Sequence, residues 1–140
     1  MLSGIFFNAT YNKGMPLIYQ HIDIQAGSVI SVEEARYLFQ TKQASFIDAR
    51  ATVEFQQNRI PNAINLPYRS PREVKLKILD EIPRDRLLII YCQNAQCTLA
   101  ERLARQLMQL GYGNVSIFSD GIDGWSAEGL PIVNQKETGK

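Results

Sequence analysis

The sequence predicts a single-domain α/β protein with a mainly parallel central sheet and helices on both faces. Short apolar runs alternate along the chain with amphipathic runs at helical spacing. Strands that alternate with helices usually pair in parallel, because each helix returns the chain to the same end of the sheet. A length of 140 residues with 45% hydrophobic residues suits one domain with a sizeable core.

The first predicted elements are a helix and a buried strand. Ser31 and Glu34 have the spacing of a capping box ahead of an amphipathic run, so a helix is predicted over about 31–41. The apolar run that ends at Asp48 predicts a short strand over 45–48, and a brief helical turn is expected at 53–55.

A second strand, a helix and a third strand are predicted in the middle of the chain. The second strand covers 63–66, and Pro71 suits the first turn of the helix that follows. The apolar residues of this helix recur at helical spacing: Val74, Ile78 and Leu79. The run at 87–91 is apolar throughout and predicts a fully buried strand.

The last part of the chain predicts a long helix, a strand and a short helix. Four leucines share one face of the long helix, which covers about 99–110: Leu99, Leu103, Leu107 and Leu110. Gly111 suits the position just after the end of this helix. A strand is predicted over 115–118 and a final short helix over 121–128.

Three residues fall at the carboxyl ends of predicted strands: Asp48, Cys92 and Ser119. Functional sites of parallel sheets form at the carboxyl ends of the strands. Cys92 also precedes a polar loop over 93–98 and the long helix, whose free N–H groups and dipole favour an anion. We therefore expect a lowered pKa for the Cys92 thiol, and the thiolate is the reactive form of cysteine.

Three groups of motifs, in order over about residues 30–133, match one known pattern. The first group is Asp48-Ala49-Arg50, Glu54-Phe55 and Arg59-Ile60-Pro61-Asn62-Ala63. The second is Leu88-Ile89-Ile90-Tyr91-Cys92, and the third is Gly111-Tyr112, Asn114-Val115, Asp120-Gly121-Ile122 and Trp125. Together these motifs resemble those of rhodanese-like domains.

The resemblance implies a rhodanese-type sulfurtransferase of sulfur metabolism that works without a cofactor. Cys92 would be the cysteine nucleophile and carry sulfane sulfur as a persulfide, taken from thiosulfate or a persulfide donor and passed to a thiol or cyanide. The substrate-binding loop would be formed by six residues: Gln93, Asn94, Ala95, Gln96, Cys97 and Thr98. Asp48 and Arg50 resemble the family's pair that supports the site.

The loop departs from the usual family pattern in its charge. Gln93, Ala95 and Cys97 stand where the family usually has an arginine, a glycine and another basic residue. Amide side chains donate hydrogen bonds but supply no net positive charge, so we expect weak binding of thiosulfate. The arginines outside the loop are predicted to be solvated, with the alternative that they rim the pocket and replace the missing charge: Arg69, Arg72, Arg84 and Arg86.

The second cysteine of the loop leaves several functions open. Three roles are open for Cys97: a packing residue, a resolving thiol or a second sulfur acceptor. A thiol redox module that uses Cys92 and Cys97 is therefore an alternative function, and a non-catalytic binding or regulatory domain is another. A phosphatase of the related type is disfavoured, because Thr98 stands where that chemistry needs an arginine.

Composition limits the partners and the metal chemistry. A formal net charge of +1 predicts no nucleic-acid partner, and two cysteines with one histidine are too few for a structural zinc site. The expected partners are a small sulfur-containing anion or a low-molecular-weight thiol, with a thiol-bearing protein as a further acceptor. Because the cysteines lie only five positions apart, a reducing, cytoplasmic location is expected.

The chain is predicted to have three parts. Residues 1–28 form an N-terminal arm, residues 29–134 the rhodanese-like domain and residues 135–140 a polar tail. His21 is expected to be a surface or packing residue of the arm. The alternative is that the arm is a remnant next to a membrane segment outside this sequence, to which the soluble domain would be attached. Membrane association is therefore expected only if residues 1–28 follow such an anchor.

Overall fold

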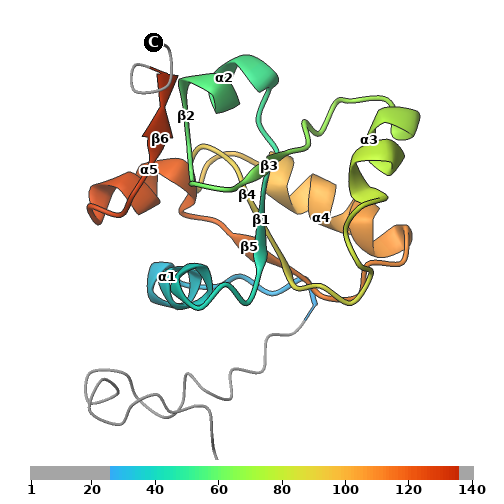
Figure 1. Ribbon diagram of the computed structural model, residues 1–140, viewed down its shortest axis with the longest axis horizontal. Helices are drawn as coiled ribbons and strands as arrows, with labels where there is room; N and C mark the ends of the chain where they lie inside the picture. The colour runs from blue at the N-terminus through green and yellow to red at the C-terminus, as the bar shows by residue number, and fades with distance from the viewer. Residues whose placement is uncertain (1–25, 136–140) are drawn as a thin grey trace, which may run out of the picture.

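Four parallel strands form the central sheet, in the spatial order β3-β1-β4-β5 (Figure 1). The strands are β1 (Ser45–Asp48), β3 (Ile64–Asn65), β4 (Leu88–Tyr91) and β5 (Val115–Phe118). The computed structural model describes residues 26–135, so His21 and most of the predicted arm lie outside the described residues. Residues 27–30 run along β5, where the Ile30 N–H donates to the carbonyl of Ile117 at 2.8 Å.

Helices cover both faces of the sheet, as the sequence predicts. The helices are α1 (Val32–Gln40), α2 (Thr52–Gln57), α3 (Arg72–Leu79), α4 (Leu99–Gln109) and α5 (Gly121–Ala127). The core clusters and Figure 1 place α1 and α5 on one face and α3 and α4 on the other. No helix within residues 26–135 has the length and apolar character needed to cross a membrane.

The start of α1 and the end of α4 follow from their sequences. In the capping box of α1, the Glu34 N–H donates to Ser31 Oγ at 3.1 Å, and the Ser31 N–H donates to Glu34 Oε1 at 2.8 Å. Helix α4 ends at Gln109, and Gly111, which follows the C-cap Leu110, has a φ of 101° that suits glycine. The Tyr112 N–H then donates to the carbonyl of Leu107 at 3.0 Å, which satisfies the helix end.

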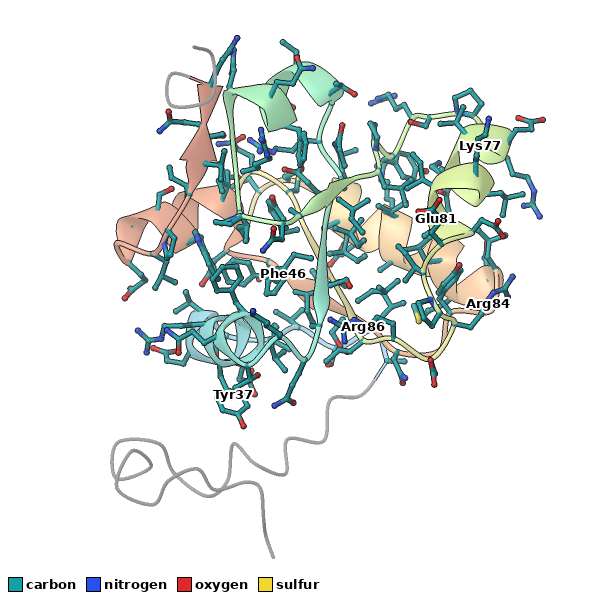
Figure 2. All side chains as sticks on the ribbon, viewed as in Figure 1. Tyr37, Phe46, Lys77, Glu81, Arg84 and Arg86 are labelled. Carbon is teal, nitrogen blue, oxygen red and sulfur yellow. A yellow bond between two sulfur atoms is a disulfide. The ribbon has the colours of Figure 1, made fainter. Side chains whose placement is uncertain are left out.

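The core lies on both faces of β4, whose four residues are all fully buried. On the α4 face, Leu103 and Leu107 pack against the sheet. On the other face, Trp125 contacts the rings of three phenylalanines, Phe39, Phe46 and Phe118. Figure 2 shows Phe46 on the side of the sheet that α1 and α5 cover. The prediction that Trp125 belongs to the core is confirmed.

Two local features differ from the predictions. The sequence does not predict β2 (Asn58–Arg59) and β6 (Val133–Asn134), which pair in antiparallel fashion, because two-residue strands are too short to show an alternating pattern. Val74, one of the apolar positions that predict α3, is 44% exposed and does not belong to the core. Lys75 takes the buried position instead, and its ammonium group donates to Gln106 Oε1 of α4 at 2.8 Å.

Candidate active site

Cys92 follows β4 directly and is 4% exposed, at the edge of a pocket of about 170 Å³. Residues 93–98 leave the sheet as a loop and lead into α4. Cys97 and Ser119 line the same pocket, so the structure brings these predicted residues together. Asp48 does not line the pocket, and it reaches the loop only through Arg50.

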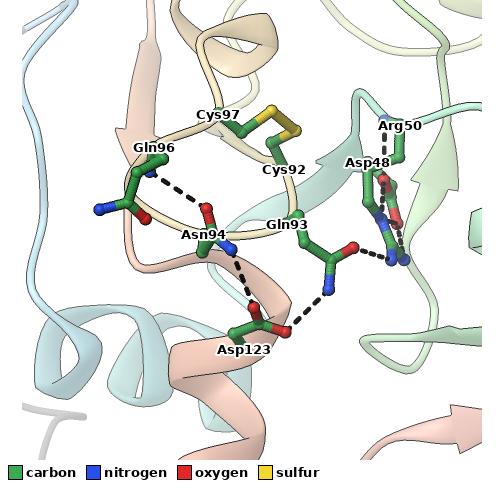
Figure 3. The surroundings of a disulfide bond; sticks show 8 residues. All are labelled: Asp48, Arg50, Cys92, Gln93, Asn94, Gln96, Cys97 and Asp123. Atoms are coloured by element: carbon green, nitrogen blue, oxygen red, sulfur yellow. Dashed lines mark hydrogen bonds and ion pairs between the residues drawn. A yellow bond between two sulfur atoms is a disulfide. The ribbon is translucent and has the colours of Figure 1, made fainter.

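Cys92 and Cys97 form a disulfide bond across the loop (Figure 3). Their Cα atoms lie 6.2 Å apart, which is within the usual range for bridged cysteines. The turn that brings them together is built by the loop itself. The Cys97 N–H donates to the carbonyl of Asn94 at 3.0 Å, and the Gln96 N–H donates to Asn94 Oδ1 at 3.1 Å.

The first turn of α5 holds the start of the loop through backbone contacts. The Ile122 N–H donates to the carbonyl of Cys92 at 3.1 Å, and the Asp123 N–H donates to the carbonyl of Gln93 at 3.0 Å. Gly121 allows this approach: its φ is +67°, and a Cβ atom there would lie 2.6 Å from both carbonyl oxygens. The loop carbonyls therefore satisfy N–H groups that a helix start leaves without partners.

The side chain of Gln93 links two charged groups on opposite sides of the loop. Its Oε1 accepts from the Arg50 guanidinium at 3.0 Å, and its Nε2 donates to Asp123 Oδ1 at 2.7 Å (Figure 3). Asn94 Nδ2 donates to Asp123 Oδ2 at 3.0 Å. The side-chain amides of Gln93 and Asn94 are thus occupied by protein partners, which fixes this part of the loop.

Arg50 forms a buried ion pair with Asp48 at 2.8 Å, and the two side chains are 2% and 0% exposed. Its remaining donors reach Asn58, whose carbonyl accepts at 2.6 Å, and Gln93. Burial opposes the charged guanidinium, but the hydrogen bond and charge of Asp48 outweigh it and raise the pKa of Arg50. The cation is therefore fully engaged by Asp48, Asn58 and Gln93, of which Gln93 belongs to the loop.

Burial also disfavours the charged form of Tyr91, the last residue of β4. Burial, together with the charge of Asp48, raises the pKa of the Tyr91 hydroxyl. The hydroxyl oxygen accepts the N–H of Ile60 at 3.2 Å and so ties β4 to the segment before β3.

Backbone N–H groups provide the positive potential of the site. Within residues 26–135, no hydrogen bond engages the backbone N–H groups of Asn94, Ala95, Thr98, Leu99 and Ala100. Most of these residues line the pocket; Thr98 is the N-cap of α4, and Leu99 and Ala100 are its first two residues. Free N–H groups at a helix start favour an anion such as a thiolate.

Among the described residues, no lysine or arginine lines this pocket, and Glu101 is its charged lining residue. The alternative that nearby arginines replace the missing loop charge is not borne out. Arg84 Nη1 donates to the carbonyl of Leu110 at 2.6 Å, and Arg86 Nε donates to Ser45 Oγ at 3.1 Å. Arg86 thus lies at the amino end of β1, opposite the end that carries the loop (Figure 2).

Sequence reasoning missed three residues that position the loop: Asn58, Gly121 and Asp123. A usable signal existed for Asp123, because it falls in the first turn of a helix that follows the strand next to β4. The carboxyl ends of neighbouring parallel strands meet at one edge of a sheet, and acidic residues favour a helix start.

Comparisons with known proteins agree with this geometry. The sequence profile of the rhodanese-like domain matches residues 31–128. A protein named "Sulfurtransferase" from Allochromatium vinosum is 35% identical over 96 residues, which cover 69% of this chain and 84% of that protein. The thiosulfate sulfurtransferase GlpE of Actinobacillus succinogenes is 29% identical over 103 residues, which cover 74% of this chain and 87% of that protein.

A solved structure supports the fold independently. The crystal structure of the BH2092 protein from Bacillus halodurans superposes with a TM-score of 0.70 at 21% identity, and the match covers 78% of each chain. The profile match spans the segment from the start of α1 to the end of α5, which contains both Asp48 and Cys92. This chain belongs to the rhodanese-like domain family.

Proposed function

We propose that the protein is a sulfurtransferase in which the reduced Cys92 carries sulfane sulfur. The observation that carries this proposal is the position of Cys92, at the carboxyl end of β4 and beside the free N–H groups that begin α4. This environment stabilises a thiolate, which is the nucleophile that attack on sulfur requires. The names of two relatives, a sulfurtransferase and a thiosulfate sulfurtransferase, support the same reaction class.

The proposed reaction has two displacement steps. The Cys92 thiolate attacks the outer sulfur of the donor, a new S–S bond forms, and the donor's leaving group departs with the electron pair. A thiolate or cyanide acceptor then attacks the outer sulfur of the Cys92 persulfide and restores the Cys92 thiolate. Backbone N–H groups stabilise the negative charge at each stage. No cofactor is required for either step.

The charges around the pocket favour a sulfane donor with little negative charge. The Arg50 cation is engaged by Asp48, Asn58 and Gln93, and Glu101 adds a negative charge at the pocket. Thiosulfate carries two negative charges, and charge-assisted hydrogen bonds from a basic loop are the usual compensation. We propose a persulfide or another singly charged donor, with a small thiol or a thiol-bearing protein as the acceptor.

A pair of donors that differ in charge tests this proposal. Reduced protein is incubated with the methanethiosulfonate anion or with thiosulfate, and sulfur added to Cys92 is measured by mass spectrometry of the intact chain. Each rate is divided by the rate of the same donor with a small free thiol, which removes differences between leaving groups. The singly charged donor is expected to react faster by about tenfold or more, the factor that one charge-assisted hydrogen bond is worth.

Cys92→Ser is the matched variant for the nucleophile. It is expected to acquire no sulfur from either donor while it keeps the circular dichroism spectrum of the wild type. Failure of native, reduced wild-type protein to acquire sulfur on Cys92 from both donors would overturn the proposal. Equal normalised rates for the two donors would leave the sulfurtransferase standing and reject the charge argument.

The disulfide favours a second candidate function, a thiol redox module that uses Cys92 and Cys97. In that case the pair exchanges electrons with a dithiol partner and no sulfur atom is transferred. A reversible disulfide without any sulfur uptake from donors would favour this function over sulfur transfer. Sulfur transfer requires Cys92 as a free thiol, and the redox function requires the disulfide to be opened again, so we propose a reducing, cytoplasmic location.

A further inference from the structure

Cys97 is placed to reach Cys92 without disturbing the contacts that hold Cys92. The loop is fixed at its start, where the Ile122 and Asp123 N–H groups hold the carbonyls of Cys92 and Gln93. The carboxylate of Asp123 further holds Asn94. Cys97 lies beyond these anchors, and its backbone N–H bonds within the loop, to the carbonyl of Asn94. The sulfur of Cys97 can therefore bond to Cys92 or separate from it while Cys92 keeps its position.

The disulfide itself identifies the atoms that meet. Cys97 Sγ is bonded to Cys92 Sγ, the inner sulfur of a Cys92 persulfide, and both cysteines line the same pocket. Displacement at sulfur requires the attacking thiolate to approach the atom at which the old bond breaks. The observed pairing is the product that attack on the inner sulfur would leave.

We propose that Cys97 is a second catalytic residue, which releases the sulfur of the Cys92 persulfide as hydrosulfide; this inference rests on the proposed sulfurtransferase function. The Cys97 thiolate attacks Cys92 Sγ, the Cys92–Cys97 bond forms, and the bond from Cys92 Sγ to the outer sulfur breaks. The outer sulfur leaves with the electron pair as HS⁻ and takes up the persulfide's proton. The sulfane sulfur is reduced to sulfide, while the two cysteine sulfurs are oxidised to the disulfide.

The reaction then needs a dithiol to start again. A dithiol reductant opens the Cys92–Cys97 bond by thiol–disulfide exchange and becomes a disulfide itself. The disulfide form seen in the structure is thus the resting product of one turnover, and the second substrate of the enzyme is a protein or small-molecule dithiol. Without a dithiol, one chain can release only one hydrosulfide.

The test uses the methanethiosulfonate anion, because its leaving group is a sulfinate and loading therefore produces no sulfide. Reduced wild-type protein, freed of reductant under anaerobic conditions, is mixed with this donor, alkylated and weighed intact, and sulfide is measured in parallel. The same is done with Cys97→Ala and with Cys97→Ser, which keeps the size of the side chain. A sample without donor controls for oxidation by other routes.

The wild type is expected to release one hydrosulfide per chain and to lose both alkylatable thiols to the disulfide. Both Cys97 variants are expected to retain one added sulfur on Cys92 and to release no sulfide. Addition of dithiothreitol is expected to give many turnovers with the wild type. From the variants it is expected to remove the added sulfur, with no release of sulfide before the dithiothreitol is added.

Two other outcomes overturn the inference, and they can be told apart. If the wild type and both variants all retain the persulfide and release no sulfide, Cys97 has no such role, and the sulfurtransferase proposal stands. If no protein, including the wild type, acquires sulfur on Cys92, the proposed function fails and this inference fails with it.

Discussion

The carboxyl ends of β1 and β4 lie side by side in the sheet, but they differ in charge and in proposed role. The end of β1 carries the full charges of Asp48 and Arg50, which are buried and paired with each other. The end of β4 carries Cys92 and a loop without a formal charge, where dipoles of backbone N–H groups act instead. The charged end is the support, and the uncharged end carries the proposed chemistry.

A single guanidinium, that of Arg50, supports the site without lining the pocket. Arg50 holds Gln93, and Gln93 in turn contacts Asp123 at the start of α5. A cation used in this way gives the loop its shape but leaves no positive charge for a substrate.

Replacement of Arg50 by methionine should destabilise the protein most. Asp48 would remain as a fully buried carboxylate without its partner, and loss of one member of a buried pair costs about 3–5 kcal/mol. The free energy of unfolding, measured by urea denaturation, is the readout. Sulfur loading of Cys92 should also fall, because Gln93 loses one of its two anchors.

Arg86→Met is the matched control, because Arg86 forms no ion pair with any residue that the structure describes. Arg86 donates to Ser45 Oγ and to the carbonyl of Lys42 and is only partly buried, so its loss should cost under about 1 kcal/mol. The double variant Asp48→Asn/Arg50→Met should be less destabilised than the sum of the single variants. Strict additivity would show that the two charges do not depend on each other.

Gly121→Ala should have the next largest effect, because it pushes α5 away from the loop. Alanine at a φ of +67° is strained, and its Cβ would lie 2.6 Å from the carbonyl oxygens of Cys92 and Gln93. We expect a loss of about 2–3 kcal/mol in unfolding free energy and slower sulfur loading.

Gly129→Ala separates the backbone strain from the collision. Gly129 has a φ of +74°, and within residues 26–135 no heavy atom beyond its chain neighbours lies within 4 Å of the Cβ that alanine would add. Its substitution should cost about 1 kcal/mol and leave sulfur loading unchanged. Equal effects of the two substitutions would contradict a special role for the contact between Gly121 and the loop.

Tyr91→Phe should have the smallest effect at neutral pH and change the alkaline stability. Because burial raises the pKa of the Tyr91 hydroxyl above its usual value of 10.0, the native state keeps a proton that the unfolded state releases. The resulting stability is fully present below about pH 10 and is lost as the pH rises above that value. Its slope is at most about 1.4 kcal/mol per pH unit.

Thermal unfolding between neutral and strongly alkaline pH measures this contribution. The variant should lose about 1 kcal/mol at neutral pH, where the Ile60 N–H loses its acceptor. Above the usual tyrosine pKa, its stability should fall less steeply than that of the wild type. Parallel curves over the whole alkaline range would falsify the link between Tyr91 burial and alkaline unfolding.

The sequence could predict the elements whose patterns are long or carry a clear end signal. The capping box of α1, the leucine face of α4 and the continuous apolar run of β4 all appear in the structure where the sequence places them. Cys92 could be located for the same reason, since a strand, a loop and a helix start follow one another in the chain.

Features that depend on tertiary contacts could not be predicted. The disulfide depends on the distance between the Cα atoms of Cys92 and Cys97, which the turn at Asn94 determines. The role of Asp123 depends on β5 lying next to β4, and the burial of Lys75 instead of Val74 depends on a hydrogen-bond acceptor from α4. Composition and periodicity contain no information about such partners.

Trp125 gives the site a natural optical reporter. It is the single tryptophan of the chain, and it lies in α5, the helix whose first turn holds the carbonyls of Cys92 and Gln93. Its ring is fully buried among Phe39, Phe46 and Phe118, so its emission depends on how α5 sits against the sheet. Intrinsic fluorescence therefore offers a way to follow the loop in the unlabelled protein, in real time and without altering either cysteine.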